Sequence, residues 1–384
     1  MRSNLSKWAG KTVIGLTGNI GTGKSVVRRM LEHLGAFGID ADALSHRVIA
    51  KNAPGYNLVI KQFGNWIVGP DGEIDRRKLG RVVFSDPQAM EILEGIVHPL
   101  VNQALDFIIE RVTKRVVVIE AIKLLESDVK GICDSIWVSY APAEIQLERL
   151  VNRRKMDEKD ARQRIKSQSP QVIKMSEANV VIKNDGSVED TWKQVVRHWK
   201  KYAPTVRLEP KEPVATVQTI SGELRIVRGS PGNSDEIAAL FNRLTNNNHQ
   251  YTRTDIMEAF GEKAFLVLKA GEKSVGVIGW QVENLVARTT DLLLEKVLPA
   301  EKAVPLMISE MEKASRELQC EASLVFLEPE IAKKERIWAD LGYERRSPQN
   351  LGVMAWREAA LDSMPDGTVL LFKKLRMDRI LRPI

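Results

Sequence analysis

A glycine-rich segment near the start of the chain holds the residue types best suited to bind phosphate. It reads LTGNIGTGKSVV over residues 16–27, and Gly18, Gly23, Lys24 and Ser25 satisfy the pattern G-x-x-x-x-G-K-[ST]. In that pattern the backbone N–H groups and the lysine bind nucleotide phosphates, and the hydroxyl binds Mg²⁺. A β-like run precedes the segment and a helical run follows it, as the pattern requires. We therefore expect a nucleotide-binding loop, and we expect Ser25 to be the metal ligand. The loop residues are Asn19, Ile20, Gly21, Thr22, Gly23, Lys24, Ser25 and Val26.

Two aspartates end the next strand-like run, AFGIDAD at residues 36–42, and a helical run, ALSHRVIA, is expected from Ala43. Asp40 and Asp42 are two residues apart, so in a strand they share a side, and ligands of open parallel sheets bind beyond the carboxyl ends of the strands. A carboxylate there can accept a hydroxyl proton or hold Mg²⁺ through water. We expect Asp42 to act in catalysis. Either aspartate could instead cap the following helix, and for Asp40 shaping the turn is the alternative.

A basic helical stretch at about 149–170 is suited to close over phosphates as a lid. Arginines can neutralise the charge that spreads over the oxygens of a transferring phosphoryl group. The acidic residues in and beside this stretch could instead pair with the arginines on a solvated helix surface. The residues alone do not single out one of Arg149, Arg153, Arg154, Arg162 and Arg164.

The composition bounds the class of protein. Of 384 residues, 43% are hydrophobic and 28% charged, and the formal net charge is +7. No run of five or six like charges occurs, which favours an anionic small molecule over nucleic acid as the partner. The first residues lack the apolar core of a signal peptide, and no charge-free stretch is long enough for a membrane span. We expect a cytoplasmic protein without a membrane segment, as a monomer or weak homo-oligomer.

The order of strand-like and helical runs predicts two α/β domains. Up to about residue 199, buried strand patterns alternate with amphipathic helices, which is typical of a parallel sheet flanked by helices. Prolines mark residues 204–221 as a linker. A second domain with antiparallel strands follows over residues 222–384. Its core is expected to contain Trp280, Trp338 and Trp356.

Residues 12–202 resemble the dephospho-coenzyme A kinase family. The resemblance rests on the phosphate-binding loop, the Asp-Ala-Asp segment with Arg47 after it, the His98-Pro99 pair, the RIKSQ run and a late Asn184-x-Gly. It implies a P-loop kinase domain at residues 1–203 that uses ATP and Mg²⁺. The implied reaction is phosphorylation of the ribose 3′-hydroxyl of dephospho-CoA, the last step of coenzyme A biosynthesis. An acceptor-binding helical insertion is expected at about 50–112.

The same resemblance implies roles for single residues. Asp42 would accept the proton of the 3′-hydroxyl, while Lys24 and Arg153 would contact the transferring phosphoryl group. Asn184 would lie near the adenine of ATP. The acceptor side would be lined by Asp40, Arg47, His98 and Glu120.

One segment departs from the family. The usual Asp-Val-Pro-Leu-Leu run is replaced by Glu-Ala-Ile-Lys-Leu at residues 120–124. Glu120 keeps a carboxylate, Ile122 replaces the proline and Lys123 introduces a cation. Because the change concerns the acceptor side, it motivates an alternative: a P-loop kinase for another small hydroxyl or nucleotide acceptor.

Residues 222–376 resemble the GNAT superfamily of acyl-CoA N-acyltransferases in the order of their elements. That family cradles the CoA pyrophosphate in a Q/R-x-x-G-x-G/A turn, whereas residues 297–307 read VLPAEKAVPLM, without glycine and with Pro305 at the expected helix start. Without glycine the backbone cannot approach a pyrophosphate closely. We expect a non-catalytic GNAT-like domain. A bifunctional kinase/N-acyltransferase and an ATP-binding regulatory protein remain as alternatives.

Overall fold

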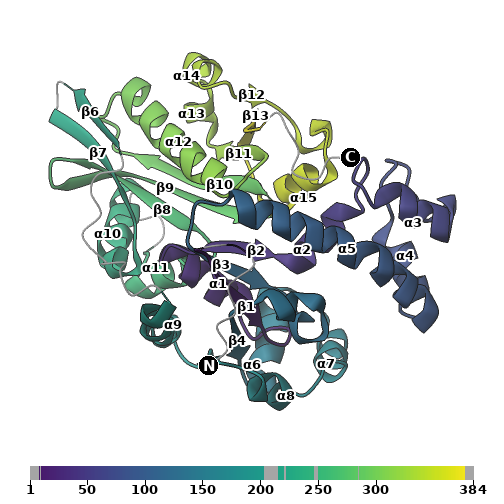
Figure 1. The fold of residues 1–384 in the computed structure, drawn as a ribbon. Coiled ribbons are helices and arrows are strands. Elements are labelled where there is room, and N and C mark those ends of the chain that lie inside the picture. The colour runs from purple at the N-terminus through teal and green to yellow at the C-terminus, as the bar shows by residue number, and fades with distance from the viewer. Residues whose placement is uncertain are drawn as a thin grey trace. The chain divides into compact units, whose positions relative to one another are not determined.

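Two β-sheets organise the chain, which we describe from a computed structural model (Figure 1). The structure describes residue 8 and residues 10–202, 215–219, 222–245, 250–283 and 285–376. By their internal contacts, these residues fall into two units. The first holds the chain up to Lys24 together with Ala36–Val181, and the second holds Ser25–Gly35 and the described residues of Ile182–Met377.

The first sheet is parallel, as expected, and has the order β2-β3-β1-β4-β5. The central strand β1 pairs in parallel with β3 and β4, and β2 pairs in parallel with β3. All five residues of β3 are buried, which is why its sequence is a continuous apolar run up to its last residue. The strands are β1 (Thr12–Thr17), β2 (Phe37–Asp40), β3 (Val116–Glu120), β4 (Ser135–Tyr140) and β5 (Val180–Lys183).

Helices connect these strands and make up the expected insertion at about 50–112. Two insertion helices begin at aspartate caps: Asp75 accepts hydrogen bonds from backbone N–H groups of the first turn of α4, and Asp86 does the same for α5, where Pro87 takes the first position. The helices are α1 (Lys24–His33), α2 (Ala41–Val48), α3 (Tyr56–Phe63), α4 (Arg76–Val83), α5 (Pro87–Arg111), α6 (Ala143–Glu148), α7 (Glu158–Lys166), α8 (Gln171–Ser176) and α9 (Val188–Tyr202).

Helix α5 is the one described helix that is long and apolar enough, by length and composition alone, to cross a membrane. A core helix of a globular protein meets the same test. Seven of its residues are buried, and the helix packs on α2 and α4 within the first unit. These contacts assign α5 to the structure of the insertion.

The second sheet has eight strands in the order β12-β13-β11-β10-β9-β8-β7-β6. Its described strand pairs are antiparallel, as expected, except that β10 and β11 run parallel. The strands are β6 (Ala215–Thr219), β7 (Gly222–Arg228), β8 (Ala264–Ala270), β9 (Lys273–Glu283), β10 (Val286–Leu294), β11 (Ala322–Leu327), β12 (Glu344–Arg345) and β13 (Val369–Lys374). The helices that follow β7 are α10 (Ser234–Leu244), α11 (Arg253–Ala259), α12 (Ala300–Glu317), α13 (Pro329–Ala332), α14 (Glu335–Asp340) and α15 (Met354–Ser363).

Alternating side chains give this sheet a separate core on each face. On β8, Leu266 and Leu268 belong to the core beneath α12, whereas Phe265 and Val267 belong to the core with α10 and α11. The prediction that three tryptophans lie in the core is confirmed. Trp280 and Trp338 are buried in the core beneath α12, and Trp356, on α15, is buried in a further core of this sheet. Helix α12 begins at Ala300, so Pro305 lies inside the helix and not at its start as expected.

The second unit also contains α1 and α9. His33 at the end of α1 makes a 2.8 Å hydrogen-bond contact through Nε2 with the carbonyl oxygen of Phe260, and the two rings meet edge to face at 5.1 Å. Arg29 donates to the carbonyl oxygen of Val282. The division of the chain into residues 1–203 and 222–384 stays a prediction. Within the expected linker, residues 215–219 form strand β6, and residues 203–214, 220 and 221 lie outside the described residues.

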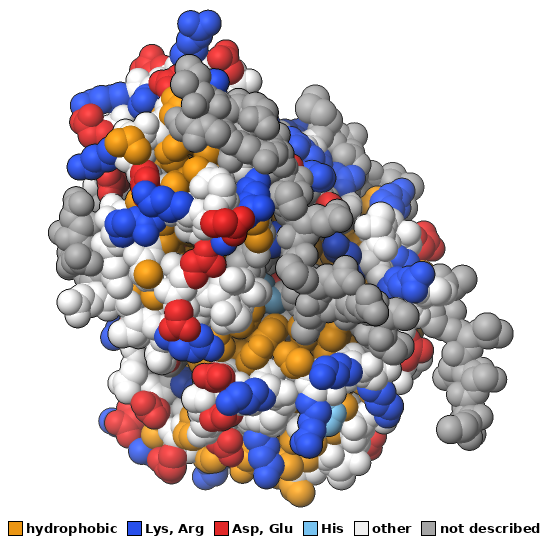
Figure 2. Space-filling view, turned by 90° about the vertical axis from the view of Figure 1, so that its left-hand side faces the viewer, with side chains coloured by type: hydrophobic (Ala, Val, Ile, Leu, Met, Phe, Trp, Pro, Cys, Tyr) orange, Lys and Arg blue, Asp and Glu red, His pale blue; other side chains and the backbone are white. Residues whose placement is uncertain are grey.

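Charged side chains of both signs are interspersed on the face of the molecule that Figure 2 shows. This matches the absence of long runs of like charge in the sequence.

Candidate active site

The loop after β1 has the backbone that its glycines predict. Gly18, Gly21 and Gly23 all have positive φ, at 152°, 75° and 87°. A Cβ atom on Gly21 would lie 3.0 Å from the carbonyl oxygen of Gln146, so a larger residue would strain the loop in two ways. The Thr22 hydroxyl donates to the carbonyl oxygen of Asn19 at 2.8 Å and closes the turn. Glycine at these positions is therefore required by the conformation of the loop.

Lys24 is a buried cation at the end of this loop. Only 8% of the residue is exposed, and its Nζ donates one long hydrogen bond, 3.4 Å, to the carbonyl oxygen of Asn19. Burial lowers the pKa of Lys24, while the negative charges of Glu120 and Asp42 act in the opposite direction. An ammonium group held this way, beside the N-terminus of α1, suits a phosphate. Lys24 is the first residue of α1, and Ser25 and Val26 follow it in the first turn.

The expected lid segment contacts the loop through residues other than the expected one. The Gln168 side chain accepts a hydrogen bond from the N–H of Ile20 at 2.7 Å, and Asn19 donates through its side chain to the carbonyl oxygen of Ser169 at 2.9 Å. Arg149 donates to the carbonyl oxygen of Gly21 at 3.1 Å. Arg153 lies in a π-helical turn, and its side chain is outside the described residues, so its catalytic role stays a prediction.

The two aspartates are placed differently from the sequence expectation. Strand β2 ends at Asp40 and α2 begins at Ala41, so Asp42 lies in the first helical turn and the two residues do not share one side of a strand. Asp40 is the N-cap: its carboxylate accepts a hydrogen bond from the N–H of Ala43 at 2.9 Å. The Asp42 carboxylate accepts one from the N–H of Ile122 at 3.0 Å, just beyond β3.

The environment of Asp42 suits a group that accepts a proton. Burial raises its pKa above the ordinary value of a carboxyl group, and the hydrogen bond from Ile122 and the charge of Lys24 partly offset this. Glu120, the last residue of β3, is 4% exposed and adds negative charge that raises the pKa of Asp42 further. The charges of Lys24 and Glu120 thus both act on Asp42, in opposite directions.

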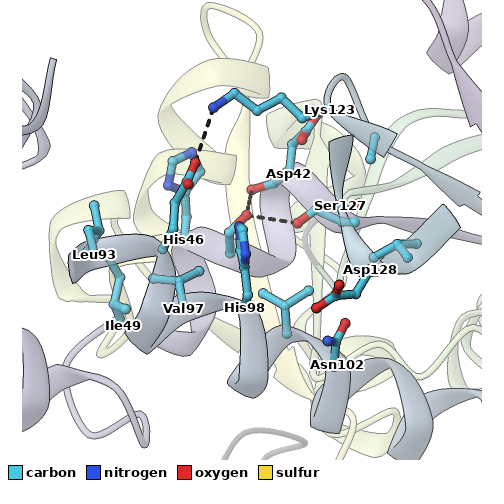
Figure 3. A pocket seen from close by; sticks show the side chains of 16 residues that line it. Asp42, His46, Ile49, Leu93, Val97, His98, Asn102, Lys123, Ser127 and Asp128 are labelled. Carbon is cyan, nitrogen blue, oxygen red and sulfur yellow. Dashed lines mark hydrogen bonds and ion pairs between the residues drawn. The ribbon is translucent and has the colours of Figure 1, made fainter. Parts of the chain in front are cut away.

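A cavity of about 250 Å³ opens beside Asp42 (Figure 3). One wall comes from α2, one from α5 of the insertion and one from the loop that follows β3. Of the four residues expected on the acceptor side, His98 lines this cavity, whereas Asp40, Arg47 and Glu120 are not among its lining residues. Lys123 lies at the rim and forms a 3.2 Å ion pair with Glu94 of α5. The lining residues are Ala41, Asp42, Ser45, His46, Ile49, Leu93, Glu94, Val97, His98, Val101, Asn102, Ala121, Lys123, Ser127, Asp128 and Val129.

Comparison with known proteins decides the family. The sequence profile described as "Dephospho-CoA kinase" matches residues 12–190. The dephospho-CoA kinase of Geobacter metallireducens is 42% identical over 192 residues, which cover 49% of this chain and 96% of that protein. The chain belongs to the dephospho-CoA kinase family.

Solved structures match each half of this family member. A crystal structure from Thermus thermophilus covers 50% of this chain and 97% of its own, with 32% identity and a TM-score of 0.46. The PaiA N-acetyltransferase of Thermoplasma acidophilum, solved in complex with coenzyme A, covers 39% of this chain and 98% of its own, with 10% identity and a TM-score of 0.31. The second match is a likeness of fold alone.

The residues of this dephospho-CoA kinase homologue fit a magnesium nucleotide. Lys24 is a buried cation whose single described hydrogen bond is long, and it ends a loop in which three glycines have positive φ. Among the described residues, no group of three His, Cys, Asp or Glu side chains could hold a metal ion. Mg²⁺ often binds through substrate phosphates and few side chains, and the assignment of Ser25 as its protein ligand stays a prediction.

Asn184 follows β5, in the second unit. It is 5% exposed, and its Oδ1 accepts a hydrogen bond from the Thr191 hydroxyl at 3.0 Å. This bond ties the loop after β5 to α9. Its placement near adenine stays a prediction.

Sequence reasoning missed two side chains at this site. Gln168 is a loop contact that lies 148 residues from its partner, and Lys174 on α8 is a buried lysine close to Asp42. The RIKSQ run that ends in Gln168 was one of the family motifs, so a signal for Gln168 was present. For Lys174 the only signal was a lysine in an otherwise apolar run, VIKM.

Proposed function

We propose that residues 12–202 transfer the γ-phosphoryl group of ATP to the ribose 3′-hydroxyl of dephospho-CoA. The observation that carries the proposal is the position of Asp42. Its carboxylate lines a cavity built partly by the insertion, and the buried ammonium of Lys24 acts on its pKa. A base and a phosphate site next to each other are what phosphoryl transfer to an alcohol requires.

In this reaction the chain's own residues bind, orient and move one proton. The 3′-oxygen attacks the γ-phosphorus, and the bond from that phosphorus to the β–γ bridging oxygen breaks, so ADP leaves. The hydroxyl proton passes to the Asp42 carboxylate. Lys24 neutralises negative charge on the phosphates, and Mg²⁺ supplies further neutralisation when it is bound. We assign Arg153 the same task from the lid, which rests on the family resemblance.

The acceptor is proposed to enter the cavity between α2 and α5. Its apolar wall, which includes Leu93, Val97 and Val101, suits the uncharged part of a dephospho-CoA molecule, and Lys123 suits its pyrophosphate. Lys123 stands where the family usually has leucine. Its positive charge at this rim is compatible with an anionic acceptor. The dephospho-CoA assignment therefore survives the departure at residues 120–124.

For the C-terminal sheet we propose no acyl transfer. Helix α12 begins at Ala300 after Pro299, without a side-chain cap, and Glu301 places a negative charge in its first turn. Negative charge at a helix N-terminus opposes the binding of a pyrophosphate there. Glu301→Ala is expected to leave unchanged any rise in melting temperature that acetyl-CoA gives the full chain, because the kinase half can bind CoA-type molecules itself; a larger rise in the variant would contradict this.

The kinase proposal is tested by incubating the full chain with ATP-Mg²⁺ and dephospho-CoA and weighing the product by mass spectrometry. We expect CoA to form, and Asp42→Asn to lower kcat by about 10²- to 10⁴-fold, as for loss of a general base. ATP affinity, measured by calorimetry, should stay close to that of the unchanged protein. Tight ATP binding without CoA formation would show that the acceptor or the chemistry has been wrongly assigned.

A further inference from the structure

The backbone N–H and carbonyl group of Ile122 both have side-chain partners. Its N–H donates to the Asp42 carboxylate at 3.0 Å, and its carbonyl oxygen accepts from Lys174 Nζ at 2.7 Å and from the Thr17 hydroxyl at 3.1 Å. The N–H and the carbonyl group of Ile122 belong to two planar peptide units that are joined at its Cα atom. Three hydrogen bonds therefore hold Ile122 on both sides, and one of them ends on Asp42.

This arrangement depends on a residue that the family's usual sequence lacks. Proline, which commonly stands at the position of Ile122, has no N–H and cannot donate a hydrogen bond. In this chain the N–H is present and reaches Asp42. A hydrogen bond to the charged form of a carboxyl group favours that form.

Lys174 is the other unexplained member of the group. It is 4% exposed, and it lies on α8, whose first residue, Gln171, donates to the carbonyl oxygen of Ala141 at 2.9 Å and ties the helix to the end of β4. Burying an ammonium group costs free energy, and an apolar side chain of similar size would fill the space at lower cost. An apolar side chain could not donate to Ile122, so this hydrogen bond is the feature that accounts for a lysine here.

The charges around Asp42 come from several elements. Lys24 of the phosphate loop and Lys174 of α8 favour its ionised form, and Glu120 of β3 opposes it. Glu126, beyond β3, faces Lys174 and favours the charged ammonium. Lys174 therefore reaches Asp42 both through the Ile122 backbone and through its charge.

We propose that Ile122 and Lys174 are positioning residues for Asp42: the N–H of Ile122 orients the carboxylate, and Lys174 holds Ile122 in place. The inference rests on the proposed function, because it concerns the base of that reaction. If it is right, the replacement of proline by Ile122 affects catalysis, because it supplies the N–H that orients Asp42. It also gives a use to the buried lysine, which the chemistry itself does not require.

Two variants separate the two arms of this arrangement. Ile122→Pro introduces the family's usual residue and removes the N–H while keeping the carbonyl group. Lys174→Met keeps the N–H and removes the ammonium. Ile122→Val keeps the N–H and is the control for the first variant, and Lys193→Met, on an exposed ion pair with Glu189, is the control for the second. Lys174→Arg restores the charge.

The measurement is kcat for CoA formation between pH 5 and 9, with melting temperatures to confirm folding. Ile122→Pro and Lys174→Met should each move the acidic limb of log kcat to higher pH by about half a unit or more, because each loses a group that favours the ionised carboxylate. Lys174→Met should also lower kcat about tenfold with little change in KM for ATP. Lys174→Arg should return the limb toward its original position.

The results distinguish a failed inference from a failed function. If the unchanged chain forms no CoA, the proposed function is wrong. If it forms CoA but both folded variants keep the acidic limb within about 0.2 units of the unchanged protein, the positioning role is wrong. A loss in Lys174→Met that appears only in KM for ATP would assign that lysine to the nucleotide. If Lys174→Met does not fold, Ile122→Pro and Lys174→Arg still decide the question.

Discussion

At the scale of single residues, Asp40 and Asp42 have different roles although they are only two residues apart. Asp40 caps α2, and Asp42 in the first turn points its carboxylate to Ile122. The cap gives α2 a defined start, and that start sets the direction of Asp42. The two carboxylates should therefore respond differently to the same substitutions.

Replacing the cap tests this division. Asp40→Ala should lower the free energy of unfolding by about 1 kcal/mol, whereas Asp40→Asn, which caps equally well, should change it by only a few tenths. Thermal or urea unfolding measures both. An Asp40→Asn protein that keeps its stability but loses affinity for dephospho-CoA would instead support the substrate-binding role expected from the family resemblance.

The pH dependence of kcat/KM for dephospho-CoA follows from the shifted groups. Asp42 must be ionised to accept a proton, and burial raises its pKa, so activity should be lost as the pH falls through a value above the ordinary carboxyl range near 4. Lys24 acts as a cation, and burial lowers its pKa, so activity should be lost again as the pH rises, below the ordinary lysine value of about 10.4. The plot of kcat/KM against pH should be bell-shaped. It should be narrower than a carboxyl group and a lysine with ordinary pKa values would give. Full activity down to pH 4 would contradict the environment described for Asp42.

At the scale of elements, the cavity depends on the approach of α5 to the loop after β3. The ion pair between Lys123 and Glu94 joins these two elements at the rim. Both side chains are partly exposed, so the pair itself adds little stability. Its interest lies in competition, because an anionic acceptor and Glu94 would bind the same ammonium group.

Variants of this pair should change acceptor affinity in opposite directions. Lys123→Met should raise KM for dephospho-CoA about three- to tenfold, because a charged hydrogen bond to its pyrophosphate is lost. Glu94→Gln should lower that KM or leave it unchanged, because the competing carboxylate is gone. Steady-state kinetics at saturating ATP measure both, and Lys130→Met, which removes another exposed ion pair, is the control. Equal KM values for Lys123→Met and the control would remove Lys123 from the acceptor site.

The elements also show what the sequence could and could not predict. The phosphate loop and the buried strands have local signals, namely glycines at fixed spacing and continuous apolar runs, and both were predicted. The start of α2 was predicted two residues late, at Ala43, and this put Asp40 and Asp42 on one side of a strand when in fact the helix begins at Ala41. The contacts of Gln168 and Lys174 join residues 148 and 52 positions apart, and no local pattern specifies such pairs.

At the scale of the whole molecule, the helix that follows the phosphate loop belongs to the same unit as the C-terminal sheet. Helix α1 contributes His33 and Arg29, and the partners of these residues are Phe260 and Val282. The Geobacter metallireducens relative matches only about half of this chain. In this protein, therefore, α1 has contacts that the matched part of the chain does not supply.

A fragment ending at Tyr202 tests how much these contacts of α1 contribute to stability and to ATP binding. It keeps every residue that the proposed chemistry uses and loses the partners of His33 and Arg29. Because α1 begins at the phosphate loop, we expect a lower melting temperature and a higher KM for ATP, with a smaller change in KM for dephospho-CoA. His33→Ala in the full chain removes the hydrogen bond and the ring contact alone, and should reproduce part of the loss, about 1–2 kcal/mol in the free energy of unfolding. If the fragment matches the full chain in both stability and KM for ATP, the C-terminal sheet does not support the kinase, and its role has to be sought in a separate activity.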